Sequence, residues 1–494
     1  MRRERKMAAL TAAAIILTMG TSMTALADWQ QINGEDWIFT DRSGNRVRDT
    51  WRQFGDYYYY LDSNGIMARN SWVDDTYYVN EDGARLSNQW IYVADSSGPG
   101  YEGGWFYLDA NGRAATDGWR TVNGRRYHFD YDGTMQYGWL NLDGNLYYLG
   151  DENDGSMKTG WVALDFDEDR GTEDGTVADA VSYGAMGKWF YFQDNGRAVK
   201  ASGGESYVSR RINGYRYYFD EQGIMATGWV DVAGRENGDP TGISTLKYFG
   251  GPDEGQMAIG WRYLGDPEDS GDNDFRFSLA TSSNAQRWDD DGDEKWYYFD
   301  SSGVPKYLST EAKNLAEATV RVNGKYYFFD GYGRMQSGLL GFRVGDGSVV
   351  STYFGADDSD GAMKRDRQTN VYDGDWERGT YYFNGSGSDR GGGYTGVRNG
   401  YLYDNGRLVE AWEDEDFQVF DVGGRLYLVN ESGRVQDRNR TYRVNGEYRY
   451  EYENGSIYYV NDRQERIGQV TSGIRMPEPG YKAVYTLTGK AVQS

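Results

Sequence analysis

Aromatic side chains recur at regular spacing along this chain, and their ring faces are its most prominent means of holding a ligand. Gly-Trp pairs enclose aromatic segments, as in GWRTVNGRRYHFDYDGTMQYGW from Gly118 to Trp139 and YRYYFDEQGIMATGW from Tyr215 to Trp229. Repetition at periods of roughly 20–50 residues is typical of solenoids and arrays. A string of such small units replaces a catalytic core, so the pattern favours a binding protein over an enzyme.

Residues suited to catalysis are few. His128 is the only histidine and the chain has no cysteine, which excludes thiol catalysis and disfavours ordinary histidine-based metal or nucleophile sites. A pair of carboxylates could hydrolyse a glycosidic bond, but no pair stands out among 76 acidic residues. Moreover, no stretch without repeats is long enough for a catalytic domain of ordinary size. We therefore expect no catalytic residues, and a glycosidase within the insertions is the alternative.

Two acidic segments are candidate calcium-binding loops by composition, namely Asp165 to Gly175 and Asp289 to Glu294. In the first segment, Arg170 occupies the sixth position, where a helix-flanked calcium loop needs glycine. In the second, Arg287 stands where the first ligand should be. We interpret both segments as solvated acidic loops and expect neither a metal nor a cofactor.

The composition limits the classes of partner. The 494 residues carry a formal net charge of −24, which disfavours nucleic acid and other bare anionic polymers. Such a surface tolerates neutral sugars and favours cationic groups. The 44 Tyr, 19 Phe and 16 Trp residues argue for an ordered chain, because disordered chains are poor in aromatics. Without disulfides the order must come from packing between neighbouring repeats.

The first residues have the composition of a secretory signal. A basic segment, Arg2 to Lys6, precedes the short apolar run Met7 to Met19, and Ala25-Leu26-Ala27 provides a cleavage site before Asp28. The alternative is a membrane anchor, but the run is shorter than the ~20 residues that span a bilayer. No later segment is apolar enough to span. We expect a secreted protein that is attached non-covalently to the cell surface or cell wall, with no membrane insertion after signal removal.

Each repeat has the pattern of a β-hairpin. An aromatic run precedes Asp/Asn-x-x-Gly or Asn-Gly, as in YYYYLDSNG (Tyr57 to Gly65), WFYLDANG (Trp105 to Gly112), WFYFQDNG (Trp189 to Gly196) and WYYFDSSG (Trp296 to Gly303). Aromatic residues favour strands, and Asn-Gly or Asp-Gly pairs supply the positive φ of tight turns. A single hairpin is marginally stable in water, so neighbouring hairpins must stack. The sequence predicts an all-β solenoid of stacked hairpins of about 20 residues each.

A longer period groups the hairpins in threes. Met135, Met225 and Met335 are 90 and then 110 residues apart, and the Asn-Gly pairs ending at Gly124, Gly214 and Gly324 repeat both intervals. Helices are scarce, and Glu311 to Thr319 is the best candidate. The predicted divisions are a signal peptide (1–27), N-terminal hairpin repeats (28–90), three-hairpin superunits (91–161, 162–261 and 262–365), degenerate C-terminal repeats (366–465) and a tail (466–494).

The pattern G-W … (W/Y)-Y-Y-(F/L)-(D/N)-x-x-G-x-M-x-x-G-W resembles the cell-wall-binding repeats of choline-binding modules. It is also similar to the related glucan-binding and clostridial-toxin glycan-binding repeats. The resemblance covers roughly Trp51 to Tyr459. It implies a β-solenoid with ligands in aromatic clefts between neighbouring hairpins. In choline-binding members a cage is built from the Gly-Trp tryptophan, the first aromatic of W-Y-Y and an aromatic residue of the following hairpin, often with a methionine.

Carried over to this chain, the fullest cage is Trp90, Trp105 and Trp119. Two further pairs match the first two cage positions, Trp161 with Trp189 and Trp261 with Trp296, while Ser209 and Thr319 stand where a third tryptophan would be. Other hairpins lack the first wall, because that position holds Arg126, Leu146, Arg216 or Leu246. The resemblance thus implies these ligand-binding candidates: Trp90, Trp105, Trp119, Trp139, Trp161, Trp189, Trp229, Trp261 and Trp296.

The same rings could instead form the solenoid core, because buried aromatics contribute large packing areas. We expect the middle residue of each Y-Y-F run to be core. We also expect methionines to fill gaps in the core more than to line cages, namely Met135, Met157, Met225 and Met257.

These observations together favour a non-catalytic, secreted protein that binds a cell-envelope polymer, either choline-substituted teichoic acid or polysaccharide. Ring faces attract quaternary ammonium groups and also stack on the flat C–H faces of sugars. Several weak sites on one chain would add avidity. The alternative is a secreted lectin or adhesin for a glucan or host glycan, and the sequence leaves the oligomeric state open.

Overall fold

The computed structural model describes residues 27–94, 103–164, 188–232, 234–265, 267, 294–374 and 377–487. Nearly all of the predicted signal peptide and of the two acidic segments lies outside the described residues. The chain divides into unit 1, Met1–Gly187 with Tyr191–Ala198, and unit 2, Lys188–Phe190 with Val199–Ser494. Over the described ranges, no helix has the length and apolar character needed to cross a membrane.

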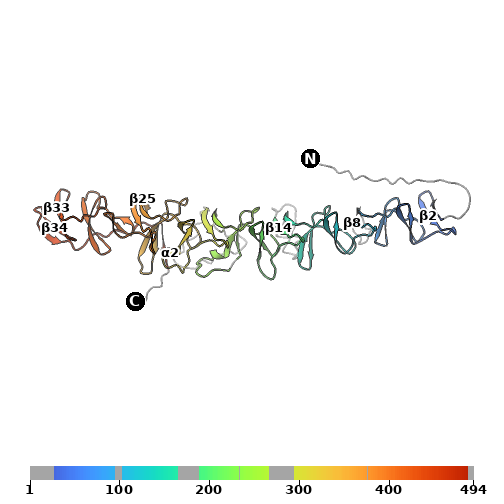
Figure 1. Ribbon diagram of the computed structural model, residues 1–494, viewed down its shortest axis with the longest axis horizontal. Coiled ribbons are helices and arrows are strands. Elements are labelled where there is room, and N and C mark those ends of the chain that lie inside the picture. The colour runs from blue at the N-terminus through green and yellow to red at the C-terminus, as the bar shows by residue number, and fades with distance from the viewer. Residues whose placement is uncertain are drawn as a thin grey trace. The chain divides into compact units, whose positions relative to one another are not determined.

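Unit 1 consists of antiparallel two-stranded hairpins that follow one another in chain order, with β2 and β8 marked in Figure 1. The paired strands are β1 (Asp28–Ile32) with β2 (Asp36–Thr40), β3 (Thr50–Phe54) with β4 (Tyr57–Leu61), β5 (Ser71–Val73) with β6 (Tyr77–Val79), β7 (Gln89–Val93) with β8 (Gly104–Leu108), β9 (Gly118–Val122) with β10 (Arg125–Phe129), and β11 (Trp139–Leu142) with β12 (Asn145–Tyr148). Strand β13 (Gly160–Leu164) follows, and β14 (Lys188–Phe192) has residues in both units.

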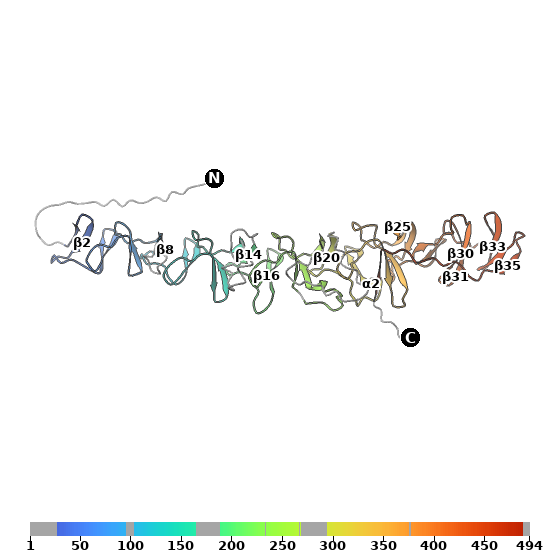
Figure 2. The same ribbon diagram turned by 180° about the vertical axis from the view of Figure 1, so that it is seen from behind.

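Unit 2 begins with the same kind of hairpin (Figure 2). The pairs are β15 (Tyr207–Ile212) with β16 (Tyr215–Asp220), β17 (Trp229–Asp231) with β18 (Leu246–Tyr248), β19 (Gly260–Leu264) with β20 (Lys295–Phe299), and β21 (Thr319–Val322) with β22 (Lys325–Phe328). A 3-10 turn, η2 (Ile243–Thr245), precedes β18. The predicted helix is present but shorter than expected, because α2 spans only Leu315–Ala318.

Larger sheets replace simple hairpins toward the C-terminal end of unit 2. The strands are β23 (Leu339–Arg343), β24 (Val349–Tyr353), β25 (Asp366–Asp373), β26 (Glu377–Phe383), β27 (Gly396–Arg398), β28 (Tyr401–Asp404), β29 (Arg407–Leu408), β30 (Phe417–Val422), β31 (Arg425–Asn430), β32 (Arg440–Val444), β33 (Glu447–Glu453), β34 (Ser456–Val460), β35 (Arg466–Gln469) and β36 (Ala483–Thr486). Strands β25 to β29 form one sheet and β32 to β35 another.

The segment that we predicted as a tail contributes to these sheets. Strand β35 pairs with β34, and β36 pairs in parallel with β23, with Leu340 opposite Ala483 and Arg343 opposite Thr486. The described part of this segment is therefore paired with other strands of unit 2, although it has no aromatic hairpin of its own.

The hairpin turns have the backbone that their sequences predict. At the three Asn-Gly pairs both residues have positive φ, for example 50° and 92° at Asn213 and Gly214. Positive φ at both positions gives a tight turn whose twist matches that of the strands. The predicted almost all-β architecture of hairpin repeats is thus confirmed.

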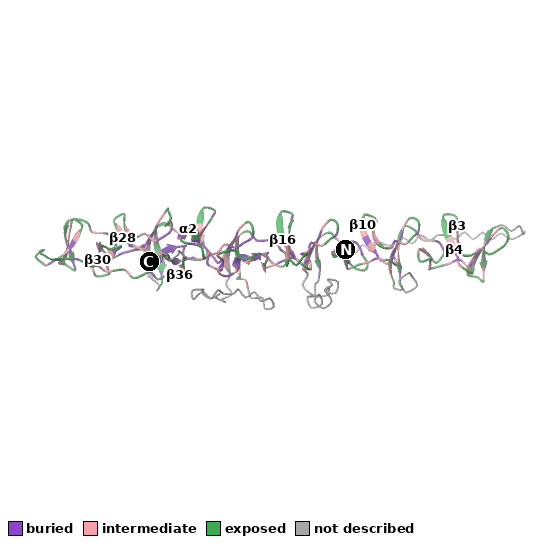
Figure 3. Cartoon of the chain, turned by 90° about the horizontal axis from the view of Figure 1, so that it is seen from below, coloured by how far each residue is buried: buried purple, intermediate pink, exposed green. Residues whose placement is uncertain are grey.

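Side chains alternate between the two faces of each hairpin. In β20, Tyr297 and Phe299 are fully buried, whereas Trp296 and Tyr298 are half-buried. Successive residues of a strand point to opposite faces, so the W-Y-Y-F run divides into a core face and an open face. Figure 3 shows the consequence along the chain, with buried residues inside the hairpins and exposed residues at their tips.

At most steps along the described hairpins, a backbone hydrogen bond connects one hairpin to the next. In unit 2 the Met335 amide donates to the Trp296 carbonyl oxygen, and in unit 1 the Met135 amide donates to that of Trp105, both at 2.8 Å. The methionine side chain then packs on a glycine of the following turn. A Cβ atom at Gly155 would lie 2.2 Å from the Met135 sulfur, so only glycine leaves room for this contact.

Candidate aromatic ligand-binding site

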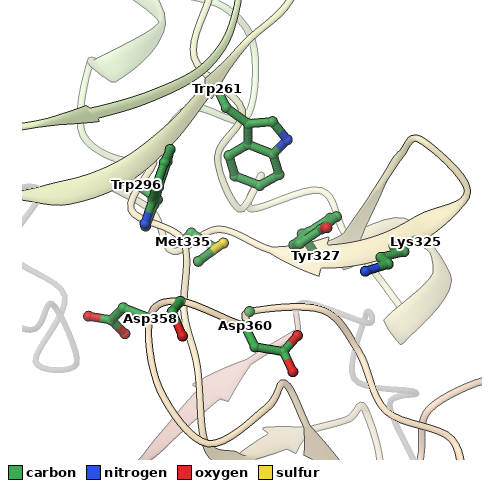
Figure 4. A pocket seen from close by; sticks show the side chains of 9 residues that line it. Trp261, Trp296, Lys325, Tyr327, Met335, Asp358 and Asp360 are labelled. Carbon is green, nitrogen blue, oxygen red and sulfur yellow. The ribbon is translucent and has the colours of Figure 1, made fainter.

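Three aromatic rings and a methionine surround a cavity of about 290 Å³ in unit 2 (Figure 4). We call this the Trp261 pocket, and its walls are Trp261, Trp296, Tyr327 and Met335. The remaining lining residues are Lys325, Asp358, Ser359, Asp360 and Gly361. Its volume lies at the small end of the range for small-molecule sites, which is roughly 300–1,000 Å³.

Strand register places the first two walls on one face of a hairpin. Trp261 of β19 lies opposite Tyr298 of β20, and Tyr263 lies opposite Trp296. Because side chains alternate, these four rings share the open face described above. The Trp261 and Trp296 ring centroids are 6.1 Å apart with planes at 87°, so the two indoles form a corner.

The third wall is Tyr327 of β22, in the following hairpin. Its ring centroid lies 4.8 Å from that of Trp261, with the planes at 70°. We had expected the third ring at the position of Thr319, but Thr319 begins β21, opposite Phe328. The structure thus supplies the missing wall from the second strand of the hairpin instead of the first.

Acidic side chains lie at the other side of the pocket, on the turn after β24. Asp358 accepts a 2.6 Å hydrogen bond from the buried Ser337 hydroxyl, and Asp360 is paired with Lys364. Burial and, secondarily, the negative charge of Asp360 raise the pKa of Tyr327. The Tyr327 hydroxyl therefore stays neutral at physiological pH, and the pocket combines neutral ring faces with carboxylates.

The methionines occupy the positions that we expected of core residues. Met135, Met225, Met257 and Met335 are all at most 9% exposed, and Met335 packs on Gly361. Met157 is half-buried and contacts Gly196. Met335 nevertheless lines the Trp261 pocket, so one side chain serves both packing and the pocket wall.

Unit 1 contains an equivalent arrangement, the Trp90 set, formed by Trp90, Trp105, Tyr127 and Met135. The Trp90 ring lies 4.9 Å from Tyr127, and the three tryptophan and tyrosine side chains pack with Met135 in one cluster. Trp119, which we had grouped with Trp90 and Trp105, instead contacts His128 and Tyr147 at 5.0 and 5.2 Å. As in unit 2, the third ring is the tyrosine eight residues before the methionine.

The remaining predicted tryptophans lie against aromatic or polar neighbours. Within unit 1, Trp139 contacts Tyr148 at 5.1 Å and Trp161 contacts Tyr191 at 5.0 Å. Within unit 2, the indole N–H of Trp189 donates to Asp253 and that of Trp229 donates to the Gly265 carbonyl oxygen. All nine predicted tryptophans are half-buried, so each packs on a hairpin while keeping part of its ring accessible.

One ring set was missed by the sequence analysis. Trp29 lies 5.5 Å from Tyr59, and Trp37 accepts the Met67 amide hydrogen bond through its carbonyl oxygen, as Trp296 does for Met335. The Trp37-to-Met67 spacing was available as a signal, but Asp28 replaces the glycine of the Gly-Trp pair and hid the repeat.

Among the described residues, the candidate metal ligands are the single histidine and the acidic side chains. Within this part of the chain, these side chains form no group of three or more arranged to hold a metal ion. His128 lies in β10, as expected of a residue that replaces a repeat tyrosine, and its Nδ1 contacts the Gln136 amide oxygen.

Three family models match separate parts of the chain. Two describe choline-binding repeats and match residues 45–84, 66–99 and 115–161. The third describes a cell wall binding repeat and matches residues 184–198, 210–225 and 288–304. The last of these segments includes Trp296 of the Trp261 pocket.

Similar proteins include two streptococcal enzymes. Glucosyltransferase-S of Streptococcus mutans is 26% identical over 226 residues, which cover 42% of this chain and 13% of the enzyme. Glucosyltransferase-I of Streptococcus downei is 24% identical over 376 residues, covering 63% of this chain and 22% of the enzyme. This chain therefore spans less than a quarter of the length of either enzyme.

Two solved structures from Streptococcus pneumoniae also match. CbpJ is 20% identical, with a TM-score of 0.37 over 74% of this chain and all of that protein. Choline binding protein F, solved with a peptidoglycan analogue, is 22% identical, with a TM-score of 0.37 over 71% of this chain and 98% of that protein. Several segments of this chain thus match choline-binding and cell wall binding repeats.

Proposed function

We propose that this chain is a non-catalytic, exported surface protein that binds quaternary ammonium groups of a cell-envelope polymer, with choline as the recognised group. The observation that carries the proposal is the Trp261 pocket, where three rings meet at steep angles beside two carboxylates. A trimethylammonium group is attracted to ring faces by roughly 0.5–2 kcal/mol per ring. The acidic side chains add long-range attraction for a cation.

The geometry favours a small cationic group over an extended sugar chain. A cavity of about 290 Å³ with two perpendicular indoles encloses a compact head group on several sides. Sugar binding through stacking uses one open ring face and several fixed polar groups instead. Repetition of the arrangement in the Trp90 set supports attachment through several weak sites.

A glucan-binding lectin is the second candidate. It is favoured by the similarity to glucosyltransferase-S over 226 residues, since that enzyme's name indicates glucosyl transfer. Half-buried tryptophans along the hairpins would then stack on sugar rings.

The proposal is tested by titrating the full chain with choline chloride and measuring the binding by calorimetry. We expect Trp261→Ala or Tyr327→Ala to weaken the affected site by about 5- to 30-fold, since one ring contributes about 1–2 kcal/mol. Trp412→Ala is the matched control, because Trp412 is 60% exposed and lies outside the ring sets.

Two further ligands separate the alternatives. The neutral isostere 3,3-dimethyl-1-butanol should bind at least several-fold more weakly than choline if the positive charge matters. Binding of soluble dextran without binding of choline would establish the lectin and refute the cation site. Release of fragments from purified cell walls would contradict the non-catalytic assignment.

A further inference from the structure

Unit 1 contains a ring set whose space is occupied by the chain itself. Trp51 of β3, Tyr58 of β4 and Tyr77 of β6 correspond to Trp261, Trp296 and Tyr327, and we call them, with Arg85, the Trp51 set. Trp51 lies opposite Tyr60 in its hairpin, and its ring centroid is 5.3 Å from that of Tyr77. The Trp51 set therefore has all three aromatic walls.

Arg85 stands where the other sets have methionine. It follows Tyr77 by eight residues, as Met335 follows Tyr327 and Met135 follows Tyr127. The Arg85 amide donates to the Tyr58 carbonyl oxygen at 2.8 Å, the same bond that Met335 makes to Trp296. Its side chain also packs on the glycine of the next turn, since a Cβ atom at Gly112 would lie 2.8 Å from the Arg85 Nε.

The guanidinium of Arg85 lies among all three rings. Its central carbon is 4.4 Å from the Tyr58 ring centroid, 5.4 Å from that of Tyr77 and 5.6 Å from that of Trp51. Each distance is within the ~6 Å range of a cation–π interaction. A methionine would fill the same packing position without charge, so the choice of arginine decides what the rings contact.

We infer that Arg85 is a specificity-determining residue, an internal cation that fills the Trp51 set and excludes the quaternary ammonium group which the Trp261 pocket accepts. The inference rests on the proposed function, because it states which of the ring sets can bind the quaternary ammonium group and which is filled by the chain itself. Exclusion has two physical causes. The guanidinium uses the ring faces that a ligand would need, and its positive charge repels a second cation.

A second arginine, at a different position of the repeat, also covers a tryptophan ring. Arg126 lies over Trp119 with its central carbon 4.6 Å from the ring centroid. It occupies the first position of the W-Y-Y pattern, where the Trp261 pocket has Trp296. Both in the Trp51 set and at Trp119, an arginine of the chain therefore covers a tryptophan face.

The test replaces Arg85 by methionine in the full chain and counts choline sites by calorimetry. We expect R85M to bind one more choline per chain than the wild type. The double variant R85M/W51A should lose that additional site, which places it at the Trp51 set. R69M is the matched control, because exposed Arg69 donates to the Glu35 carbonyl oxygen instead of a ring set, and it should leave the stoichiometry unchanged.

The outcomes separate this inference from the proposed function. A folded R85M with wild-type stoichiometry, in a chain that binds choline, refutes the role of Arg85 and leaves the proposed function standing. Choline binding by R85M alone, with none by the wild type, supports the role of Arg85 and refutes the other cation sites. If neither chain binds choline, both proposals fail. Should R85M not fold by circular dichroism, R85Q is measured in its place, with the same expectations.

Discussion

Methionine lies beside the ring sets of most hairpins up to residue 365, whereas arginine covers tyrosine faces in the C-terminal region, residues 366–487. There Arg443 lies 4.2 Å from the Tyr448 ring centroid, and Arg466 lies 4.1 Å from that of Tyr458. Only two of the 16 tryptophans, Trp376 and Trp412, follow residue 365. The hairpins therefore retain partly accessible indoles, while the C-terminal region packs arginines on its tyrosine rings.

The two regions also differ in what holds them together. The hairpins depend on edge-to-face and tilted ring contacts and on methionine–glycine contacts, whereas the C-terminal region has multi-stranded sheets and a buried polar cluster. In that cluster, Asp373 accepts a 2.6 Å hydrogen bond from Tyr381, pairs with Arg407 at 3.3 Å and accepts the Gly480 amide. The comparison indicates that the C-terminal region is built for cohesion and the hairpins for exposure of ring faces.

The largest predicted effect concerns this buried cluster. Asp373→Ala removes a buried carboxylate from three partners and should destabilise the C-terminal region by about 3 kcal/mol, as expected when one member of a buried ion pair is lost. Limited proteolysis should then cleave the chain between residues 466 and 487, because Gly480 loses its attachment. The exposed Asp462→Asn should behave as the wild type. Equal protease resistance of the Asp373 variant would show that cohesion resides elsewhere.

A smaller effect is expected at the methionine–glycine contacts. Gly155→Ala forces a methyl group into the buried Met135 side chain and should destabilise unit 1 by about 2–3 kcal/mol through overpacking and strain at φ 57°. Gly144→Ala shares the positive φ, at 77°, but meets no atom within 4 Å, so it should cost only roughly 1 kcal/mol. Thermal unfolding followed by near-UV circular dichroism compares the two variants. Equal midpoints would contradict the importance of the contact.

The smallest predicted effect is a difference in how the stability of two matched turns, at Asp300 and Asn430, depends on pH. Burial opposes ionisation of Asp300, but hydrogen bonds from Ser302 and Lys306 prevail and lower its pKa from 3.8 to about 2. The resulting stabilisation is present above the unfolded pKa of 3.8 and is lost as the pH falls through about 2. Asn430 makes the same turn bonds with a neutral amide, accepting the Arg434 amide at 2.8 Å.

Asp300→Asn should therefore fold normally and lose this acid-side dependence, whereas Asn430→Asp should acquire one. Unfolding midpoints measured between pH 5 and pH 2 provide the comparison. An unchanged slope in the Asp300 variant would show that the Lys306 interaction does not stabilise the fold.

The hairpins could be predicted from the sequence because local patterns determine them. Asn-Gly turns and aromatic runs of period two act over a few residues, and the structure has them where the sequence places them, as at Asn213 and Gly214. The third wall of the pocket was harder to predict, since counting from Gly-Trp pairs led to Thr319. Tyr327 is identified only by the register between successive hairpins, in which the Met335 amide bonds to Trp296.

The role of Arg85 could not be predicted for a different physical reason. A long side chain can extend to solvent or fold over a ring, and spacing alone does not distinguish these conformations. Similarly, β36 reaches β23 across more than a hundred residues, and a parallel pairing of this kind leaves no local sequence signal.

The amide-to-carbonyl bond between successive hairpins has a consequence for how such a gene can evolve. Because most described hairpins present the same acceptor and the same donor, duplication or deletion of one such hairpin rejoins compatible neighbours. Exchange of methionine for arginine at the donor residue then changes what the aromatic rings of a copied hairpin contact. The backbone that joins this hairpin to its neighbours is not altered.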